Sequence, residues 1–186
     1  MQSRPEKPKL AWAITGSGHY LEECLEIIRE LPDVDLFYSR AGEEVIRMYG
    51  HDPKALNTGG HVYRDRAASA PPVGLFYRGD YHTLVVAPAT SNTVAKMVMG
   101  VSDTLVTNVY AQAGKCRVPS IVLACDTISE VDTPAPDRMV RLWPRAIDLQ
   151  HTETLRTFEA TTVVESAESL YVTLKKRLEE VNANHG

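Results

Sequence analysis

The sequence predicts an α/β fold, with a mainly parallel sheet as the middle of three α/β/α layers. Short, continuously apolar runs alternate along the chain with longer segments of helical periodicity. This alternation is typical of parallel strands that are covered by helices on both faces. The 186 residues fit one domain, which we predict over 1–186 with a flexible polar segment at 1–9. In such sheets, ligands bind beyond the carboxyl ends of the strands.

The first half of the chain supplies two strands and two helices. LAWAI at 10–14 predicts a strand, and TGSG at 15–18 predicts the turn that follows it. An amphipathic helix comes next, because its apolar residues recur at the i, i+3, i+4, i+7 spacing: Leu21, Cys24, Leu25, Ile28 and Leu31. Residues 34–39 then predict a second strand, and 41–50 a helix that is closed by its glycine.

Residues 51–75 carry little periodicity, so we expect a long connection with at most short elements. Connections of that length in compact domains are often functional or form interfaces.

The second half continues the alternation. Residues 83–87 and 120–124 predict buried strands, and about 25 helical residues lie between them with a break near Gly100. Weaker strand patterns follow at the ranges 139–143 and 161–165. The final segment predicts an amphipathic helix, with apolar residues at helical spacing: Leu170, Tyr171, Leu174, Leu178 and Val181.

Composition excludes several classes of function. The net charge is −4 and no block of Lys and Arg is long enough for a nucleic-acid-binding arm. We find no apolar signal segment and no stretch of about 20 apolar residues, so we expect no contact with a membrane. Cys24, Cys116 and Cys125 lack the spacing of metal ligands, which favours reduced thiols in a cytoplasmic protein and no metal site.

The turn after the first predicted strand, TGSGHY, has two possible interpretations. A dinucleotide site would need a small residue where Leu21 stands and an acid where Ser39 and Arg40 stand, so NAD binding is disfavoured. An arginine at position 40 can bind a ribose 2′-phosphate, so the sequence still allows NADPH. A tight turn with a helix cap explains the motif equally well. The hydroxyls of Thr15 and Ser17, beside the free amides of a helix start, also suit a phosphate group.

The stretch APATSNTVAK at 87–96 adds a second polar cluster. Pro88 cannot donate a hydrogen bond to a sheet, so we expect the strand to stop there. One hydroxyl or amide side chain suffices to cap the next helix, yet four follow in a row: Thr90, Ser91, Asn92 and Thr93. At the ligand edge of a parallel sheet, this surplus favours a polar heteroaromatic ligand or a phosphate.

Three other features carry less information. His19 and His82 border predicted strand ends, but no acid or cysteine is spaced to form a triad or metal site with them. The series Arg138, Arg141 and Arg145 fits either a cationic edge for a ligand or subunit, or an ordinary solvated face.

APATSNTVAKMVMGVSDTLV closely resembles the PAT-x-NT-x-AK-x-x-x-G-x-x-D-x-L signature of the flavoproteins grouped with the homo-oligomeric flavin-containing cysteine decarboxylases. AITGSGHYLEE resembles their phosphate loop, and the similarity covers nearly the whole chain. The decarboxylases carry a histidine where this chain has Gly74, and a P-x-MN-x-x-MW motif where it has ACDTISEVD. SRAGEEVIRMYG instead resembles the dihydromethanopterin reductase branch.

This resemblance implies a Rossmann-like domain that binds FMN. Its activity would be hydride transfer from reduced FMN to a dihydropterin, most simply dihydromethanopterin, in tetrahydromethanopterin biosynthesis and one-carbon metabolism. NAD(P)H or another electron donor would reduce the flavin again. Two alternatives stay open: a flavin-binding electron carrier without a pterin site, and, less favoured, a flavin-dependent cysteine decarboxylase.

The resemblance also assigns roles to individual residues. The phosphate loop comprises Thr15, Gly16, Ser17 and Gly18, with Ser39 completing it. Residues 90–93 take the ribityl chain and the polar edge of the flavin ring. Cys125 and Asp126 line the pterin side, and the proton comes from Asp126, His19 or water. We expect a homo-oligomer based on trimers, extending to a larger shell, with 51–75 and 92–113 as candidate interface segments.

Overall fold

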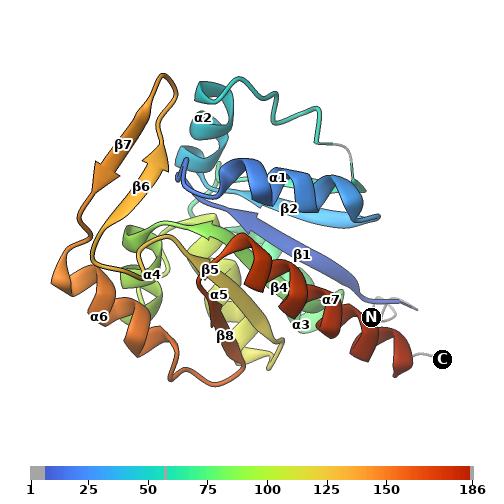
Figure 1. The fold of residues 1–186 in the computed structure, drawn as a ribbon. Coiled ribbons are helices and arrows are strands. Elements are labelled where there is room, and N and C mark those ends of the chain that lie inside the picture. The colour runs from blue at the N-terminus through green and yellow to red at the C-terminus, as the bar shows by residue number, and fades with distance from the viewer. Residues whose placement is uncertain (1–6, 57, 185–186) are drawn as a thin grey trace.

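The computed structural model describes residues 7–56 and 58–184 and is built on a six-stranded sheet. Its strands are β1 (Lys9–Ile14), β2 (Val34–Tyr38), β3 (Gly59–Arg64), β4 (Tyr81–Ala89), β5 (Ser120–Ala124) and β8 (Thr161–Val164). They lie in the order β3-β2-β1-β4-β5-β8, and every neighbouring pair is parallel. The predicted α/β fold with a mainly parallel sheet is therefore confirmed (Figure 1).

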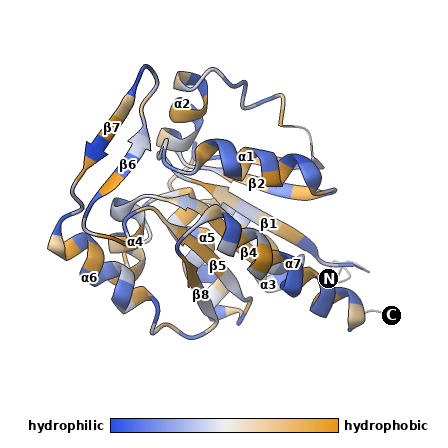
Figure 2. Ribbon diagram, in the orientation of Figure 1, coloured by the Kyte–Doolittle hydropathy of each residue, from blue (hydrophilic) through white to orange (hydrophobic). Residues whose placement is uncertain are grey.

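Helices cover both faces of this sheet. The helices are α1 (Leu21–Glu30), α2 (Arg40–Met48), α3 (Gly74–Arg78), α4 (Ser91–Val98), α5 (Leu105–Lys115), α6 (Ala146–Leu155) and α7 (Ala167–Ala183), and a 3-10 turn covers Pro71–Val73. Residues of α1 and α7 pack on one face, and residues of α3 and α5 pack on the other. Figure 2 shows the hydrophobic strands between helices whose outer sides are hydrophilic.

The predicted helices agree with the structure to within a few residues. The apolar positions of α1 are buried, as its spacing requires. The helical stretch after β4 is broken into α4 and α5, and Gly100 in the break has a φ of +70°, a conformation that glycine adopts without strain. Among the described residues, no helix has the length and hydropathy needed to cross a bilayer.

The segment 51–75 was expected to hold at most short elements, and it contains a 3-10 turn and the six-residue strand β3, an edge strand that pairs with β2. Its pattern is weak because an edge strand buries little side-chain surface. Gly60 is needed there, since a Cβ atom on it would lie 2.2 Å from the Val34 carbonyl oxygen. The predicted flexible segment 1–9 falls largely outside the described residues, and Lys9 is already part of β1.

The predicted strand end at Pro88 also needs correction. β4 continues to Ala89 through a cis Ala87–Pro88 peptide bond. Pairing with β5 shifts register between Val86 and Ala89, so the missing proline N–H falls where the ladder is already interrupted. The proline carbonyl turns instead toward Thr15 at the end of β1.

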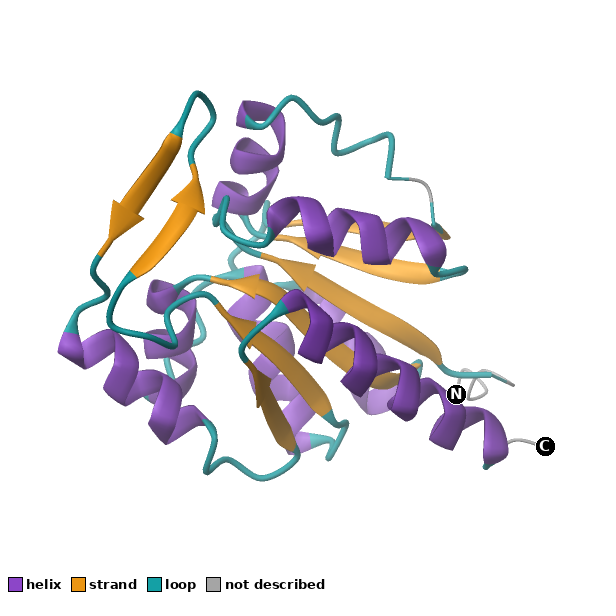
Figure 3. Ribbon diagram, viewed as in Figure 1, coloured by secondary structure: helices purple, strands orange, loops and turns teal. Residues whose placement is uncertain are grey.

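The strand predicted at 139–143 exists, but it lies outside the central sheet. β6 (Val131–Pro134) and β7 (Met139–Leu142) form an antiparallel hairpin that stands apart from the other strands (Figure 3). The Tyr49 hydroxyl at the end of α2 donates a 2.7 Å hydrogen bond to the Pro134 carbonyl and holds one end of the hairpin. Helix α6, which the sequence analysis missed, follows and packs beside α4.

The strand order places the switch point of the sheet at β1. From β1 the chain first adds β2 and β3 on one side, and it then returns to add β4 on the other side. The carboxyl ends of these neighbouring strands form the crevice where ligands bind in sheets of this kind.

Replacing Gly42 with alanine tests the close contact between α2 and β1. A Cβ atom at residue 42 would lie 2.5 Å from the Ile14 carbonyl oxygen. We expect Gly42→Ala to lower the free energy of unfolding by about 1–3 kcal/mol, as overpacking does. Gly114→Ala is the matched control, because nothing lies within 4 Å of its added Cβ. In thermal and urea unfolding the control should gain roughly 0.5–1 kcal/mol of helix stability; equal losses in both variants would contradict the packing argument.

Candidate functional site

A cleft of about 540 Å³ lies beyond the carboxyl ends of β1, β2 and β4. We call it the strand-end cleft. Its volume falls within the range of small-molecule and cofactor sites. It brings together many of the predicted binding residues, and its lining is Thr15, Gly16, Ser39, Arg40, Ala41, Asp65, Ala68, Thr90, Ser91, Asn92, Thr93, Lys96, Asp103 and Thr104.

Thr15 joins the three segments that form the floor of this cleft. Its side chain is buried, and its hydroxyl donates a 2.7 Å hydrogen bond to the Pro88 carbonyl oxygen. The Thr15 hydroxyl oxygen in turn accepts a 3.0 Å hydrogen bond from the Thr90 amide. One hydroxyl therefore fixes the end of β1 against the end of β4 and the start of α4.

Thr90 and Thr93 use their side chains to begin α4. The Thr90 hydroxyl accepts a 3.2 Å hydrogen bond from the Thr93 amide, and the two hydroxyls lie 3.0 Å apart. Capping thus accounts for two of the four polar residues. Ser91 and Asn92 remain in the first turn, whose amides have no partner within a helix. Their amides and side chains can serve a polar or anionic ligand.

A second helix begins at the same cleft. Ser39 caps α2 by accepting a 2.9 Å hydrogen bond from the Gly42 amide. Gly16 lets the turn after β1 approach this helix, since a Cβ atom there would lie 2.6 Å from the Ala41 Cβ. The amino ends of α2 and α4 both face the cleft, and the positive ends of their dipoles favour a negative charge between them. A phosphate-bearing cofactor fits this arrangement.

Sequence reasoning considered Arg40 but missed the other charged residues that line the cleft, namely Asp65, Lys96 and Asp103. Lys96 forms an ion pair with Asp103 at 2.8 Å, and both belonged to the recognised signature without being assigned a role. The Arg40 side chain donates a 2.9 Å hydrogen bond from Nε to the Asp65 carbonyl oxygen. Asp65 follows β3, so it could not be placed while that strand was undetected.

Ser17 and Gly18 lie outside the lining of the strand-end cleft. Cys125 directs its thiol to the Ser17 hydroxyl at 3.2 Å, and the same hydroxyl accepts a 3.1 Å bond from the His19 amide. A Cβ atom on Gly18 would lie 1.8 Å from the Tyr49 hydroxyl oxygen, so only glycine fits there. Ser17 therefore contacts two residues, Cys125 and His19, that line a second hollow.

That second hollow, which we call the Cys125 hollow, has a volume of about 520 Å³. It lies at the ends of β5 and β8, and Cys125, His19, Tyr20 and Arg156 contribute to its wall. Burial raises the pKa of the Cys125 thiol to about 12, against a smaller opposing effect of the Ser17 hydrogen bond. The thiol is therefore protonated at neutral pH and is not a nucleophile.

Only one of the two predicted proton donors lines either of these cavities. His19 lines the Cys125 hollow, and burial lowers its pKa, against smaller opposing effects of Glu23 and Asp126. Asp126 lines neither the strand-end cleft nor this hollow, although its carbonyl oxygen accepts a 2.9 Å bond from the Thr152 hydroxyl. The imidazole of His19 is consequently mostly neutral at pH 7.

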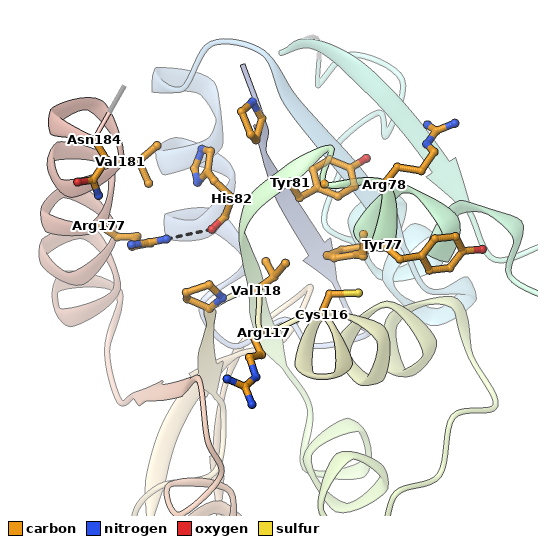
Figure 4. A pocket seen from close by; sticks show the side chains of 14 residues that line it. Tyr77, Arg78, Tyr81, His82, Cys116, Arg117, Val118, Arg177, Val181 and Asn184 are labelled. Atoms are coloured by element: carbon orange, nitrogen blue, oxygen red, sulfur yellow. Dashed lines mark hydrogen bonds between the residues drawn. The ribbon is translucent and has the colours of Figure 1, made fainter. Parts of the chain in front are cut away.

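A larger hollow of about 610 Å³ lies at the opposite, amino end of β4 (Figure 4). Tyr81, His82, Val118 and Arg177 contribute to its wall. Arg177 donates through Nη2 to the His82 carbonyl oxygen at 3.1 Å, a contact that ties α7 to β4. Of the residues noted in the sequence analysis, His82, Cys116 and Val181 line this hollow, and none of them was assigned to a binding site. Size alone therefore does not mark the functional site.

The role of Thr15 can be tested by removing its hydroxyl. Thr15→Val keeps the shape of the side chain but leaves the Thr90 amide without its partner, while the Pro88 carbonyl keeps only the 3.3 Å bond from the Thr15 amide. We expect the free energy of unfolding to fall by about 1–3 kcal/mol, the cost of unsatisfied buried polar groups. Urea unfolding measures this loss, and Thr15→Ser is the control because it retains the hydroxyl. A valine variant as stable as the serine variant would refute the bridging role.

Comparison with known proteins identifies the family. The profile of the Flavoprotein family matches residues 1–183. The chain is similar to DmrB from Burkholderia xenovorans, which was solved in complex with FMN and is described as a cubic protein cage for redox transfer. The two sequences are 50% identical, and the match covers 95% of this chain and 98% of the DmrB chain with a TM-score of 0.87.

Two curated relatives are named dihydromethanopterin reductase (acceptor). The Methanosarcina mazei protein is 39% identical over 141 residues, and the Methanocaldococcus jannaschii protein 41% over 131. The matches cover 69% and 63% of this chain but only 59% and 53% of the relatives. From the match over nearly its whole length, we conclude that this chain belongs to the Flavoprotein family.

Proposed function

We propose that this protein is an FMN-dependent reductase that converts a dihydropterin, specifically 7,8-dihydromethanopterin, to its tetrahydro form. The observation that carries the proposal is the strand-end cleft, where two helix amino ends converge, in a chain 50% identical to an FMN-binding protein. The names of the two curated relatives support the substrate. The matches span only part of their lengths, so activity and substrate stand as proposals.

The cleft residues divide into two groups for this cofactor. Gly16, Ser39 and the amino end of α2 suit the phosphate, because backbone amides and a helix dipole converge there. Ser91 and Asn92 suit the ribityl hydroxyls and the polar edge of the ring, since capping does not use their side chains. Lys96 would remain paired with Asp103 at the rim, so this pair adds no net charge, and the attraction for a bound anion comes from the two helix amino ends.

Bound FMN would supply the hydride, and the protein would supply position and protons. We assign the pterin to the side of Ser17 and Cys125, where the Cys125 hollow opens beside the turn that forms the cleft. The protonated Cys125 thiol can donate a weak hydrogen bond there without reacting. Decarboxylation has less support, because Gly74 replaces the histidine and carries no side chain that can act on a carboxylate.

The partners follow from the same proposal. We infer that NAD(P)H or another donor reduces the flavin, and that copies of the chain associate into trimers that build a shell. Support for association comes from the cage described for the B. xenovorans protein. We also infer a cytoplasmic location, because Cys24, Cys116 and Cys125 are all free thiols.

Anaerobic reoxidation tests the proposed activity. Purified protein is loaded with FMN, reduced, and mixed with dihydromethanopterin in a stopped-flow instrument. We expect the visible absorbance of oxidised flavin to return as tetrahydromethanopterin forms. A spectrum that stays reduced would favour the carrier, and protein that binds no FMN would overturn both functions. Dihydrofolate in a parallel reaction tests which pterin is preferred.

The pH dependence of that reaction tests His19 as proton donor. Because burial lowers its pKa below the ordinary 6.5, the imidazolium is lost as pH rises through a value under 6.5. We expect the reoxidation rate to fall between about pH 5 and 8, by up to about tenfold per unit above that pKa. His19→Asn should remove this slope while leaving FMN affinity unchanged, and Asp126→Asn is the parallel variant. Superimposable profiles for His19→Asn and wild type would exclude His19.

A further inference from the structure

Tyr20 departs from two local preferences at the start of α1. It stands at the N-cap position, where serine, threonine, aspartate and asparagine are favoured, and its side chain caps no helix amide. Its φ is +63°, in the left-handed region that a bulky side chain adopts only with strain. Positions where a sequence departs from local preference are expected to be functional or strained sites. The contacts of this side chain show what the strain achieves.

The side chain of Tyr20 makes one contact on each side of the Cys125 hollow. Its ring packs on the imidazole of His19, with ring centroids 3.8 Å apart and planes inclined at 41°. Its hydroxyl donates a 2.9 Å hydrogen bond to the Glu165 carbonyl oxygen, just past the end of β8. Tyr20 thus joins the turn after β1 to the far wall of the hollow, which both Tyr20 and His19 line.

The recorded hydrogen bonds of His19 use only its backbone. Its amide donates to the Ser17 hydroxyl at 3.1 Å, and its carbonyl oxygen lies 3.9 Å from the Cys125 thiol that points to it. Within the part of the chain that the structure describes, neither imidazole nitrogen has a hydrogen-bond partner. Backbone bonds fix where His19 stands but leave its ring free to turn. Packing against Tyr20 supplies that restraint, and the nitrogens stay open to a ligand.

Burial, more than charge, sets the ionisation of the imidazole. Its other ionisable neighbours are Glu23 on α1, Asp126 and Cys125 after β5, and Arg156 and Glu165 beside β8. Burial lowers the pKa of His19, and Glu23 and Asp126 oppose this with smaller effects. The other neighbours add little, because the arginine and glutamate pair with each other and the thiol is protonated. Removing the ring that covers the imidazole therefore raises its pKa toward the ordinary 6.5.

We propose that Tyr20 is a positioning residue, which holds the imidazole of His19 in the wall of the Cys125 hollow for proton transfer to a bound substrate. The inference rests on the reductase function proposed above. In that reaction the C=N bond of a dihydropterin gains a hydride at carbon from the reduced flavin, which is oxidised, and a proton at nitrogen. The imidazolium of His19 gives this proton, becomes neutral and recovers a proton from water.

Histidine hydrogen exchange tests the contact without any turnover. The hydrogen on Cε1 of a histidine exchanges with deuterium at a rate that follows the pKa of the ring, and mass spectrometry reads it peptide by peptide. The next histidine after His19 is His51, so a peptide around His19 reports that ring alone. In full-length FMN-loaded protein, Tyr20→Ala should raise the pKa of His19 toward 6.5. Tyr20→Phe keeps the ring and should retain the wild-type pKa.

Two further variants guard this measurement. Tyr20→Gly also removes the ring, and it suits the positive φ, so it folds without the strain and should shift His19 as the alanine variant does. Tyr171→Ala is the matched control, because it removes a partly exposed tyrosine ring on α7. It should leave the pKa of His19 unchanged. Circular dichroism confirms the fold of each variant.

Anaerobic reoxidation of the reduced flavin then tests the catalytic consequence. At low pH, where the imidazolium is fully formed, we expect Tyr20→Ala to be about ten- to a hundredfold slower than wild type, because the proton donor is no longer aligned. Because the pKa of His19 rises, the fall of its rate with pH should begin at higher pH. Tyr20→Phe should keep both the rate and the profile of wild type, which a loss of the hydroxyl bond alone would not allow.

The outcomes separate this inference from the proposed function. A His19 that titrates as in wild type in both Tyr20→Ala and Tyr20→Gly overturns the contact, whatever the turnover. A phenylalanine variant that behaves like the alanine variant, or an equal shift in Tyr171→Ala, also overturns it. A shifted His19 in a protein whose His19→Asn variant keeps the wild-type pH profile instead refutes proton transfer from His19.

Discussion

The hydroxyl of Thr15 is the interaction on which the candidate site depends. It donates to the Pro88 carbonyl and accepts from the Thr90 amide, so the ends of β1 and β4 and the start of α4 meet at one oxygen. Because this oxygen is buried, each bond is protected from competing water and its loss leaves polar groups unsatisfied. The position of the α4 amino end, and hence of Ser91 and Asn92, follows from it.

Close backbone approach supplies the second constraint. Gly16 allows the turn after β1 to contact Ala41, and Gly42 allows α2 to contact the Ile14 carbonyl. Together they bring the amino end of α2 to the cleft that α4 already faces. Two helix dipoles then act on the same volume, which favours an anionic group more than either helix would alone. The fold thus concentrates positive potential in a protein whose net charge is negative.

The two sides of the TGSG turn differ in chemistry. The strand-end cleft offers backbone amides, hydroxyls and the Lys96–Asp103 pair at its rim. The Cys125 hollow instead combines the ion pair of Arg156 and Glu165 with two groups that burial keeps neutral, because burial raises the pKa of Cys125 and lowers that of His19. Ser17, which contacts both Cys125 and His19, lies between them.

The sequence by itself determined the layers of the fold and the strands β1, β2, β4 and β5, because buried parallel strands leave continuous apolar runs. It also determined that polar residues 15–18 and 90–93 follow strand ends. It did not reveal β3, whose edge position gives it little apolar pattern, and it ended β4 at residue 87, two residues before the observed end at Ala89.

Only the tertiary structure decided which of these residues share a cavity. Thr15, Gly16, Ser39 and 90–93 line the strand-end cleft, whereas Cys125 and His19 line another hollow and Asp126 lines neither. Strand order and side-chain direction set these groupings, and both depend on pairings between residues far apart in the chain. The same reason separates β7 from the central sheet, because its partner is the neighbouring β6 and its local pattern is that of any strand.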